Sequence, residues 1–198
     1  AALLIHQGVQ QAREQAARYA AARAAEGTMA VHFVDVGQGD CEFIELPNGE
    51  TMLIDAGERD RGQTVVNYIN SLGYTEITYM IATHPHSDHI GGLSAVLREL
   101  DVKNIYMPNA ASTSSTYDSF LTAVENEGCR VIEAKQGVSV VSDDENGLSA
   151  YMLAPVSSGY EDLNNYSAVL MVDFFNTSFL FMGDAEALAE KEITADVS

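Results

Sequence analysis

Short apolar runs separated by turn residues fill most of the chain after residue 28. Runs of this length that are rich in Val, Ile, Leu, Met and Phe are typical of buried strands. Pro47-Asn48-Gly49 predicts a hairpin turn, and Gly137–Gly147 predicts a hairpin with an acidic loop. The pattern predicts strands at Ala30–Asp35, Cys41–Leu46, Met52–Asp55, Ile77–Ala82, Asn104–Met107, Arg130–Ala134, Ala150–Leu153, Ala168–Phe174 and Phe179–Met182.

Apolar residues at three- and four-residue spacing indicate helices between several of these strands. The predicted helices are Gln63–Leu72, Gly91–Leu100, Ser115–Asn126 and Ala185–Ile193. Consecutive hairpins therefore mix with strand–helix units along one chain. This order predicts an α/β sandwich of mixed β-sheets with helices outside, and argues against a purely parallel doubly wound sheet.

The first 26 residues follow a different pattern. They contain ten alanines and no proline, so they favour a helix that ends at Gly27. Its weak apolar stripe would consist of Ile5, Val9, Ala12, Ala16, Tyr19 and Arg23. We therefore divide the chain into a helical extension, residues 1–28, and a main domain, residues 29–198. The helix could link the domain to an upstream one, pack on the body, or mediate oligomerisation.

Composition and charge narrow the possible functions. The 198 residues are 46% hydrophobic and 20% charged, as in soluble globular proteins, and no apolar run approaches the ~18 residues of a membrane span. The net charge of −19 argues against a protein that coats nucleic acid or binds anionic lipid. A phosphodiester could still be reached at a metal-lined cleft. Cys41 and Cys129 are expected to be free buried thiols rather than a disulfide.

Three of the five histidines fall within six residues, in His84-Pro85-His86-Ser87-Asp88-His89. The segment follows a predicted strand, where α/β enzymes place ligand-binding loops. In an extended loop His84 and His86 would point the same way and serve one cation, while Asp88 and His89 could serve a second. Mixed imidazole and carboxylate ligands suit Zn²⁺, with Mn²⁺ or Fe as alternatives.

This His-x-His-x-Asp-His segment resembles the signature of the metallo-β-lactamase superfamily. Val34–Asp40 resembles the opening of its ComEC-like branch, named for the competence protein that takes up DNA. Leu53–Gly57 is similar to the superfamily's second-hairpin motif, and Phe181–Asp184 to its strand-end Gly-Asp motif. The resemblance covers residues 29–198 and implies a metallo-β-lactamase-like αββα sandwich of mixed β-sheets, preceded by the N-terminal helix.

The resemblance also implies a ligand set. His84 and His86 would bind one metal ion, and Asp88 and His89 a second. Asp184 would bridge the two ions, which are expected to be Zn²⁺, with Mn²⁺ also possible.

Two further aspartates would support this centre. Asp55 would hold the metal loop by hydrogen bonds without touching an ion, or else serve only as a turn cap. Asp40 would either line the site or stabilise its turn.

The chain departs from the family pattern in two places. Asn164-Asn165-Tyr166-Ser167 stands where other members carry a further histidine, so the first ion would rely on water or polar side chains. A last histidine of the family would follow Ser198, so the domain is expected to be C-terminally incomplete. Neither His6 nor His32 is a convincing replacement, and His32 reads as a strand-face residue. A second copy, the Ala-rich helix or a separate chain would cover the open sheet edge.

The resemblance implies a metal-dependent hydrolase that attacks a phosphoester or phosphodiester through a metal-bound hydroxide oriented by Asp88. Small phosphoesters and nucleic acid are the expected substrates, and Arg59, Arg61, Asn164 and Ser167 are candidates for substrate contact. A catalytically impaired or non-catalytic module for binding or assembly is the alternative, and low activity is expected without the missing part. A β-lactam hydrolase is a weaker alternative. The acidic domain behind an Ala-rich spacer favours an extracytoplasmic or secreted location.

Overall fold

The computed structural model describes residues 2–195, together with the side chains of these residues except 2–9 and 13. The expectations for Ile5, His6, Val9 and the segment 196–198 lie outside these described residues.

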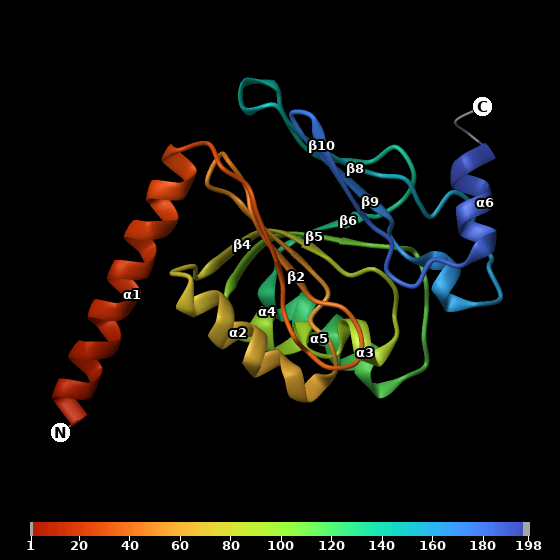
Figure 1. Cartoon of the computed structure of the whole chain (residues 1–198). Coiled ribbons are helices and arrows are strands. Elements are labelled where there is room, and N and C mark those ends of the chain that lie inside the picture. The colour runs from red at the N-terminus through yellow and green to blue at the C-terminus, as the bar shows by residue number, and fades with distance from the viewer. Residues whose placement is uncertain (1, 196–198) are drawn as a thin grey trace.

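A six-stranded mixed sheet forms the centre of the molecule (Figure 1). Its strands lie in chain order, antiparallel from β1 to β3 and parallel from β3 to β6. The tight turn at Pro47-Asn48-Gly49 joins β2 to β3 as predicted. The strands are β1 (Ala30–Phe33), β2 (Glu42–Glu45), β3 (Thr51–Ile54), β4 (Glu76–Ile81), β5 (Asp101–Met107) and β6 (Arg130–Glu133).

A second, four-stranded sheet is antiparallel throughout, in the order β10-β9-β8-β7. Its strands are β7 (Ser139–Asp143), β8 (Leu148–Met152), β9 (Leu170–Phe174) and β10 (Thr177–Phe181). The hairpin predicted within Gly137–Gly147 is confirmed, and its first arm is the strand β7, which the sequence pattern does not single out. The acidic turn η2 (Asp144–Asn146) connects β7 to β8.

Helices lie mainly on the outer face of the six-stranded sheet. The four predicted helices are present, and the one predicted at Gly91–Leu100 is α4, which begins two residues later and ends one residue earlier. The chain forms α3 inside the histidine segment, and α4 begins only after Gly91-Gly92. The elements are η1 (Arg59–Arg61), α2 (Gly62–Ser71), α3 (Ser87–Ile90), α4 (Leu93–Glu99), α5 (Ser115–Glu127), η3 (Leu163–Tyr166) and α6 (Ala187–Ala195).

Two apolar cores hold the layers together. One lies between the six-stranded sheet and its helices and contains Phe43, Ile69, Met80 and Phe120. The other lies between the two sheets and contains Ile44, Met52, Leu170 and Phe181. Adjacent β2 residues such as Phe43 and Ile44 enter different cores because successive strand side chains point to opposite faces. The predicted sandwich of mixed sheets is therefore confirmed.

The N-terminal helix α1 (Ala2–Ala25) lies along one side of the sandwich (Figure 1). Its backbone packs so closely on Gly73 that a Cβ there would come within 2.3 Å of the Ala17 nitrogen. Ala20 is buried in this contact region. The predicted apolar stripe is therefore wrong in part: Tyr19 is 59% exposed, and the backbone of Ala16 and Ala17 makes the close approach to Gly73.

The carboxylate of Glu45 on β2 connects α1 to the sandwich. It accepts hydrogen bonds from Arg23 (Nη2–Oε2, 2.5 Å), Tyr74 (2.5 Å) and His32 (2.8 Å), and the other ring nitrogen of His32 contacts Tyr68 at 2.9 Å. Burial alone would raise the pKa of Glu45, but the hydrogen bonds from Tyr74, Arg23 and His32 outweigh it and lower the pKa. His32 thus joins two elements rather than simply lining a strand face.

We expect Glu45→Gln to destabilise the protein by about 1–3 kcal/mol at neutral pH, because the charged acceptor of three hydrogen bonds is lost. The folded pKa lies below the ordinary value of 4.5, so this stabilisation is present above pH 4.5 and is lost as the pH falls through the folded pKa. Urea unfolding at several pH values should show the difference between variant and wild type narrowing in acid. The exposed Glu125→Gln is the control; a pH-independent difference for Glu45→Gln would contradict the expectation.

Both cysteines are free, as expected, but only Cys41 is buried, since Cys129 is half-buried. Burial strongly raises the pKa of the Cys41 thiol, with smaller contributions from neighbouring acidic groups. Within residues 2–195, none of the helices combines the length and hydropathy that crossing a bilayer requires.

Candidate metal centre

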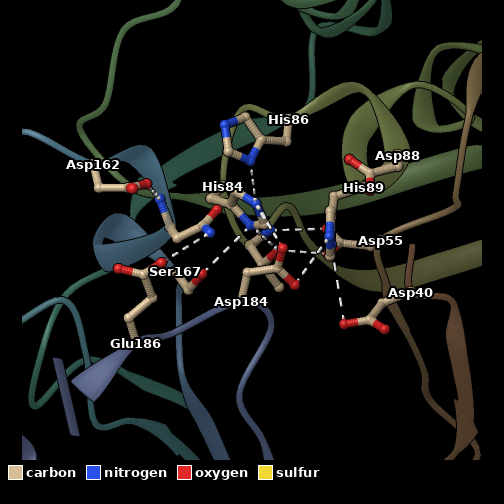
Figure 2. Close-up of polar contacts among 12 residues, drawn as sticks. Asp40, Asp55, His84, His86, Asp88, His89, Asp162, Ser167, Asp184 and Glu186 are labelled. Carbon is tan, nitrogen blue, oxygen red and sulfur yellow. Dashed lines mark hydrogen bonds and ion pairs between the residues drawn. The ribbon is translucent and has the colours of Figure 1, made fainter. Parts of the chain in front are cut away.

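The histidine segment lies at one end of the two sheets, where several loops meet (Figure 2). His84 and His86 follow β4, and His89 lies on α3. Asp55 directly follows β3, while Asp184 follows β10 of the second sheet. The site is therefore assembled from the ends of strands in both sheets.

Asp55 holds the histidine segment in place. Its buried carboxylate accepts hydrogen bonds from the Thr83 backbone N–H at 2.9 Å, the Thr83 hydroxyl at 2.5 Å and His89 Nδ1 at 2.8 Å. Asp55 has a φ of +52°, a left-handed conformation that Asp and Asn adopt more readily than most residues. These hydrogen bonds are the contacts that Asp55 needs if it holds the metal loop in place, the role predicted for it.

The same hydrogen bonds set which ring nitrogen of each histidine faces the centre. Thr83 donates its hydroxyl proton to Asp55, so at 3.1 Å it accepts from His84 Nδ1. His89 Nδ1 likewise donates to Asp55. With both Nδ1 atoms engaged, the Nε2 atoms of His84 and His89 face the centre, as metal-binding histidines generally require.

These Nε2 atoms converge on Asp184. His89 Nε2 lies 3.3 Å from Asp184 Oδ1, and His84 Nε2 lies 3.8 Å from Oδ2. One ligand atom from each of the three residues lies within 4.8 Å of the others. His86 Nδ1 is 3.0 Å from His84 Nε2, so the third imidazole borders the same group. Two to three imidazoles beside a carboxylate fit a Zn²⁺ or Mn²⁺ ion.

The pKa directions of the two central histidines differ. Burial lowers the pKa of His84 to about 3, and the charges of His89 and His86 lower it further in the same direction, so the ring of His84 is neutral. Burial would also lower the pKa of His89, but the hydrogen bond to Asp55 and the charges of Asp55, Asp184 and Asp40 raise it to about 9. The protein thus favours positive charge between His89 and Asp184, the charge that a divalent cation would supply.

Asp40, Asp55 and His89 also bring ligand atoms within 4.8 Å of one another. Asp55 and His89 Nδ1 are already joined by their hydrogen bond, while Asp40 stands 4.0 Å from His89 Nδ1. Burial raises the pKa of Asp40, and His89 opposes this shift. Asp40 therefore lines the site rather than only stabilising its turn.

The structure does not bring Asp88 into either ligand group. Its carboxylate instead accepts from Gln38 Nε2 at 3.4 Å, and Figure 2 shows it apart from Asp184. The reason is local: α3 begins at Ser87, so neighbouring residues Asp88 and His89 point about 100° apart around a helical turn. His89 points inward, while Asp88 faces the loop that contains Gln38.

The four predicted substrate residues divide into two pairs. Ser167 contacts His84 Nδ1 at 3.4 Å. Asn164 lies on η3, the short helix that directly precedes Ser167. Arg59 turns away to donate to Ser119 on α5. Arg61 lies beside Gly37, whose added Cβ would be 3.8 Å from the guanidinium.

Sequence reasoning missed three residues around the centre. Glu186 accepts hydrogen bonds from the side chains of Asn164 and Asn165, and Gln38 contacts Asp88. Burial raises the pKa of Glu42 to about 8, with Asp40 and Asp55 adding to the shift. Gln38 lies inside the Val34–Asp40 motif, and Glu42 and Glu186 each lie two residues after the last aspartate of a motif, so these positions could have drawn attention to all three.

Comparison with known proteins places the chain in a family. The model of the metallo-beta-lactamase superfamily matches residues 34–196. ComE operon protein 3 of Bacillus subtilis is 27% identical over 180 residues, which cover 82% of this chain and 23% of that protein. Recombination protein 2 of Haemophilus influenzae is 28% identical over 169 residues, which cover 83% of this chain and 19% of that protein. The chain thus spans about a fifth of the length of these relatives.

Solved structures share the fold at low sequence identity. A Thermotoga maritima protein described as a metallo-beta-lactamase aligns with a TM-score of 0.54 at 14% identity, covering 86% of this chain and 88% of its own. A Cronobacter sakazakii metallo-beta-lactamase aligns with a TM-score of 0.53 at 15% identity, and the alignment covers 76% of this chain and 55% of that protein. The fold, the histidine segment and the family match agree, and the chain belongs to the metallo-beta-lactamase superfamily.

Proposed function

We propose that this domain is a metal-dependent hydrolase of phosphoester bonds, with phosphodiesters as the preferred class. One observation carries the proposal: Asp55 and Thr83 orient His84 and His89 so that both Nε2 atoms face Asp184. A bound divalent ion polarises a phosphoryl oxygen and lowers the pKa of coordinated water, which is the chemistry that ester hydrolysis needs.

The relatives support a phosphodiester. One carries the name Recombination protein 2, which concerns nucleic acid, and nucleic acids are phosphodiester polymers. The net charge of −19 disfavours a long, tightly held duplex, because uncompensated acidic surface repels phosphates. Short or single-stranded phosphodiesters that approach only the cationic centre fit both observations.

The residues of the chain would divide the work as follows. His84, His86, His89 and Asp184 would hold the ions, and Asp55 would keep the imidazoles aligned. Asp88, which accepts from Gln38 and lies outside both ligand groups, would reach an ion only if this contact were released. Arg61 would contact a phosphate group on the side of the Gly37–Asp40 loop.

The purified chain should bind two equivalents of Zn²⁺ or Mn²⁺ and hydrolyse bis(p-nitrophenyl) phosphate, and a chelator should abolish turnover. His84→Ala should lose both properties. Metal binding without turnover of any phosphodiester would contradict the hydrolase and favour the binding or assembly module. The position of the Asp88 carboxylate outside both ligand groups is the observation that favours this alternative. Turnover of nitrocefin alone would favour a β-lactam hydrolase.

We expect Arg61→Ala to raise KM for a phosphodiester about fivefold with little change in kcat, because one exposed charge-assisted contact is worth about 1 kcal/mol. Arg59→Ala is the matched control, since Arg59 donates to Ser119 instead. Steady-state kinetics of both variants provide the measurement. Equal effects of the two substitutions would show that Arg61 does not contact the substrate.

A further inference from the structure

We propose that Asn164 is an oxygen ligand of the ion held by His84 and His86, where the family pattern would have a further histidine. This inference rests on the metal dependence proposed above. It changes the role of Asn164 from a substrate contact to a member of the metal centre.

The amide oxygen of Asn164 has no partner in the protein. Among the described residues, Asn164 Oδ1 is the buried side-chain nitrogen or oxygen atom for which no hydrogen bond is formed. Such atoms are rare in folded proteins, because a buried oxygen loses its bond to water without gaining another. An orphaned buried oxygen three residues before Ser167, which contacts His84, calls for a partner that is not a protein donor.

The orientation of the amide is fixed. Asn164 Nδ2 faces Glu186 Oε1 at 3.5 Å, and Asn165 Nδ2 donates to Glu186 Oε2 at 3.2 Å. A carboxylate only accepts hydrogen bonds, so the NH₂ group of Asn164 must face Glu186 and the oxygen must face away from it. Asp162 fixes the backbone as well, since it accepts from the Asn164 N–H at 3.0 Å.

The position of Asn164 on η3 places it one turn before the residue that contacts His84. In a 3₁₀ helix the side chains at positions i and i+3 lie above one another. Asn164 and Ser167 have this spacing and are joined by a backbone hydrogen bond of 3.0 Å. Ser167, which directly follows η3, touches His84 Nδ1 with its Oγ at 3.4 Å, so the C-terminal end of η3 borders His84.

Other contacts keep η3 against the metal loop. The backbone N–H of Ala168 donates to the Thr83 carbonyl at 2.9 Å. A Cβ on Gly183 would lie 3.2 Å from Ser167 Oγ, so the Gly-Asp motif packs on the same turn. Figure 2 shows Asp162, Ser167 and Glu186 grouped on one side of His84, with His89 and Asp40 on the other.

An amide oxygen is a chemically suitable third ligand. Carbonyl and carboxylate oxygens bind divalent cations readily, and imidazole accompanies them in mixed sites. The amide is neutral, so an ion held by two imidazoles and Asn164 would keep more of its positive charge than one held by a carboxylate. This charge would face an anionic substrate group.

The test is a metal titration of the purified chain with Mn²⁺ or Zn²⁺ alone. Asn164→Ala should weaken the binding of one of two ions about tenfold or more and leave the second unchanged. Asn164→Asp, which retains an oxygen, should restore the affinity. The exposed Asn176→Ala is the matched control and should bind both ions like wild type. With Co²⁺, Asn164→Ala should change the visible absorption spectrum.

A purely structural role would give a different result. Thermal unfolding in the presence of a chelator should show Asn164→Ala as stable as wild type or more so, since an unpartnered oxygen is removed, while added metal should stabilise it less. If wild type binds two ions and Asn164→Ala has the same affinities and the same Co²⁺ spectrum, the inference is overturned but the proposed function stands. If wild type binds no divalent ion, both are overturned.

Discussion

Asp55→Asn is expected to weaken metal binding about 10- to 100-fold, the usual cost of losing a residue that orients metal-binding histidines. Asn keeps the size of the side chain and tolerates the left-handed φ of +52°, so the backbone should remain in place. The change therefore replaces one charged acceptor oxygen by an NH₂ donor without altering the size of the side chain. We expect it to affect the centre more than any other single conservative substitution.

The physical reason lies in the histidine tautomer. An Asn side chain has one acceptor oxygen where Asp55 now accepts from the Thr83 backbone, the Thr83 hydroxyl and His89. Its NH₂ group would meet His89 Nδ1 or Thr83 as a second donor. His89 would relieve this conflict by moving its proton to Nε2, and a protonated Nε2 does not bind a metal ion.

Competition with a chromophoric chelator measures the affinity, and circular dichroism shows whether the variant is folded. The exposed Asp101→Asn, on β5, is the control for loss of one surface charge. A folded Asp55→Asn protein with wild-type metal affinity would refute the assignment of Asp55 as the residue that sets both tautomers.

Gly39→Ala is expected to displace the Gly37–Asp40 loop and reduce turnover on the order of 10²-fold, as a shift of about 1 Å near a reacting centre commonly does. A Cβ on Gly39 would lie 1.7 Å from the Asp88 carbonyl oxygen and 2.6 Å from its carbon. Both are backbone atoms, so no side-chain rotation relieves the overlap. Either the loop or α3 must move, and α3 carries His89.

Gly37→Ala provides a matched control. Gly37 and Gly39 have nearly equal φ values of +81° and +85°, so alanine costs a similar backbone strain of about 1–2 kcal/mol at both. The nearest atom to a Cβ on Gly37 is 3.8 Å away, an ordinary contact. Metal content, melting temperature and turnover of both variants should separate the overlap from the strain. Equal losses would show that the Gly39–Asp88 contact is unimportant.

The fold was predictable wherever the sequence pattern repeats within an element. Ile77–Ala82 is apolar apart from Thr78, and β4 (Glu76–Ile81) is accordingly flanked by a core on each face. β7 was missed as a strand because Ser139–Asp143 has only two adjacent valines between small polar residues and ends in an aspartate. Its pairing with β8 supplies the stability that its own composition does not.

The boundaries of α3 and the contacts of α1 depend on distant residues. Four residues, Ser87–Ile90, are too few for a periodic pattern, and Asp55 holds them through His89. The docking of α1 depends on Gly73 and Glu45, which lie far along the chain from Arg23. Local propensity predicts that α1 is a helix but not which face it buries.

Residues of the site were predictable to the extent that motifs contain them. The motifs placed His84, His86, His89, Asp55 and Asp184 together, and the structure brings them to one end of the sandwich. The direction of Asp88 was not predictable because it follows from the start of α3 at Ser87, which no periodic pattern marks. The direction of Arg59 was not predictable because it depends on one hydrogen bond to Ser119 on α5. Glu186 and Gln38 act through tertiary contacts that no local spacing reveals.

The buried thiol of Cys41 allows local unfolding to be measured on the unmodified protein. Cys41 lies directly before β2, between Asp40 and Glu42, and is 3% exposed. A maleimide reagent can reach the Cys41 thiol only when this part of the chain leaves the core. The alkylation rate of Cys41 therefore measures how often the segment that joins Asp40 to β2 opens. Cys129, half-buried near β6, supplies an internal reference on the same molecule, and mass spectrometry of the two peptides would follow both without any engineered label.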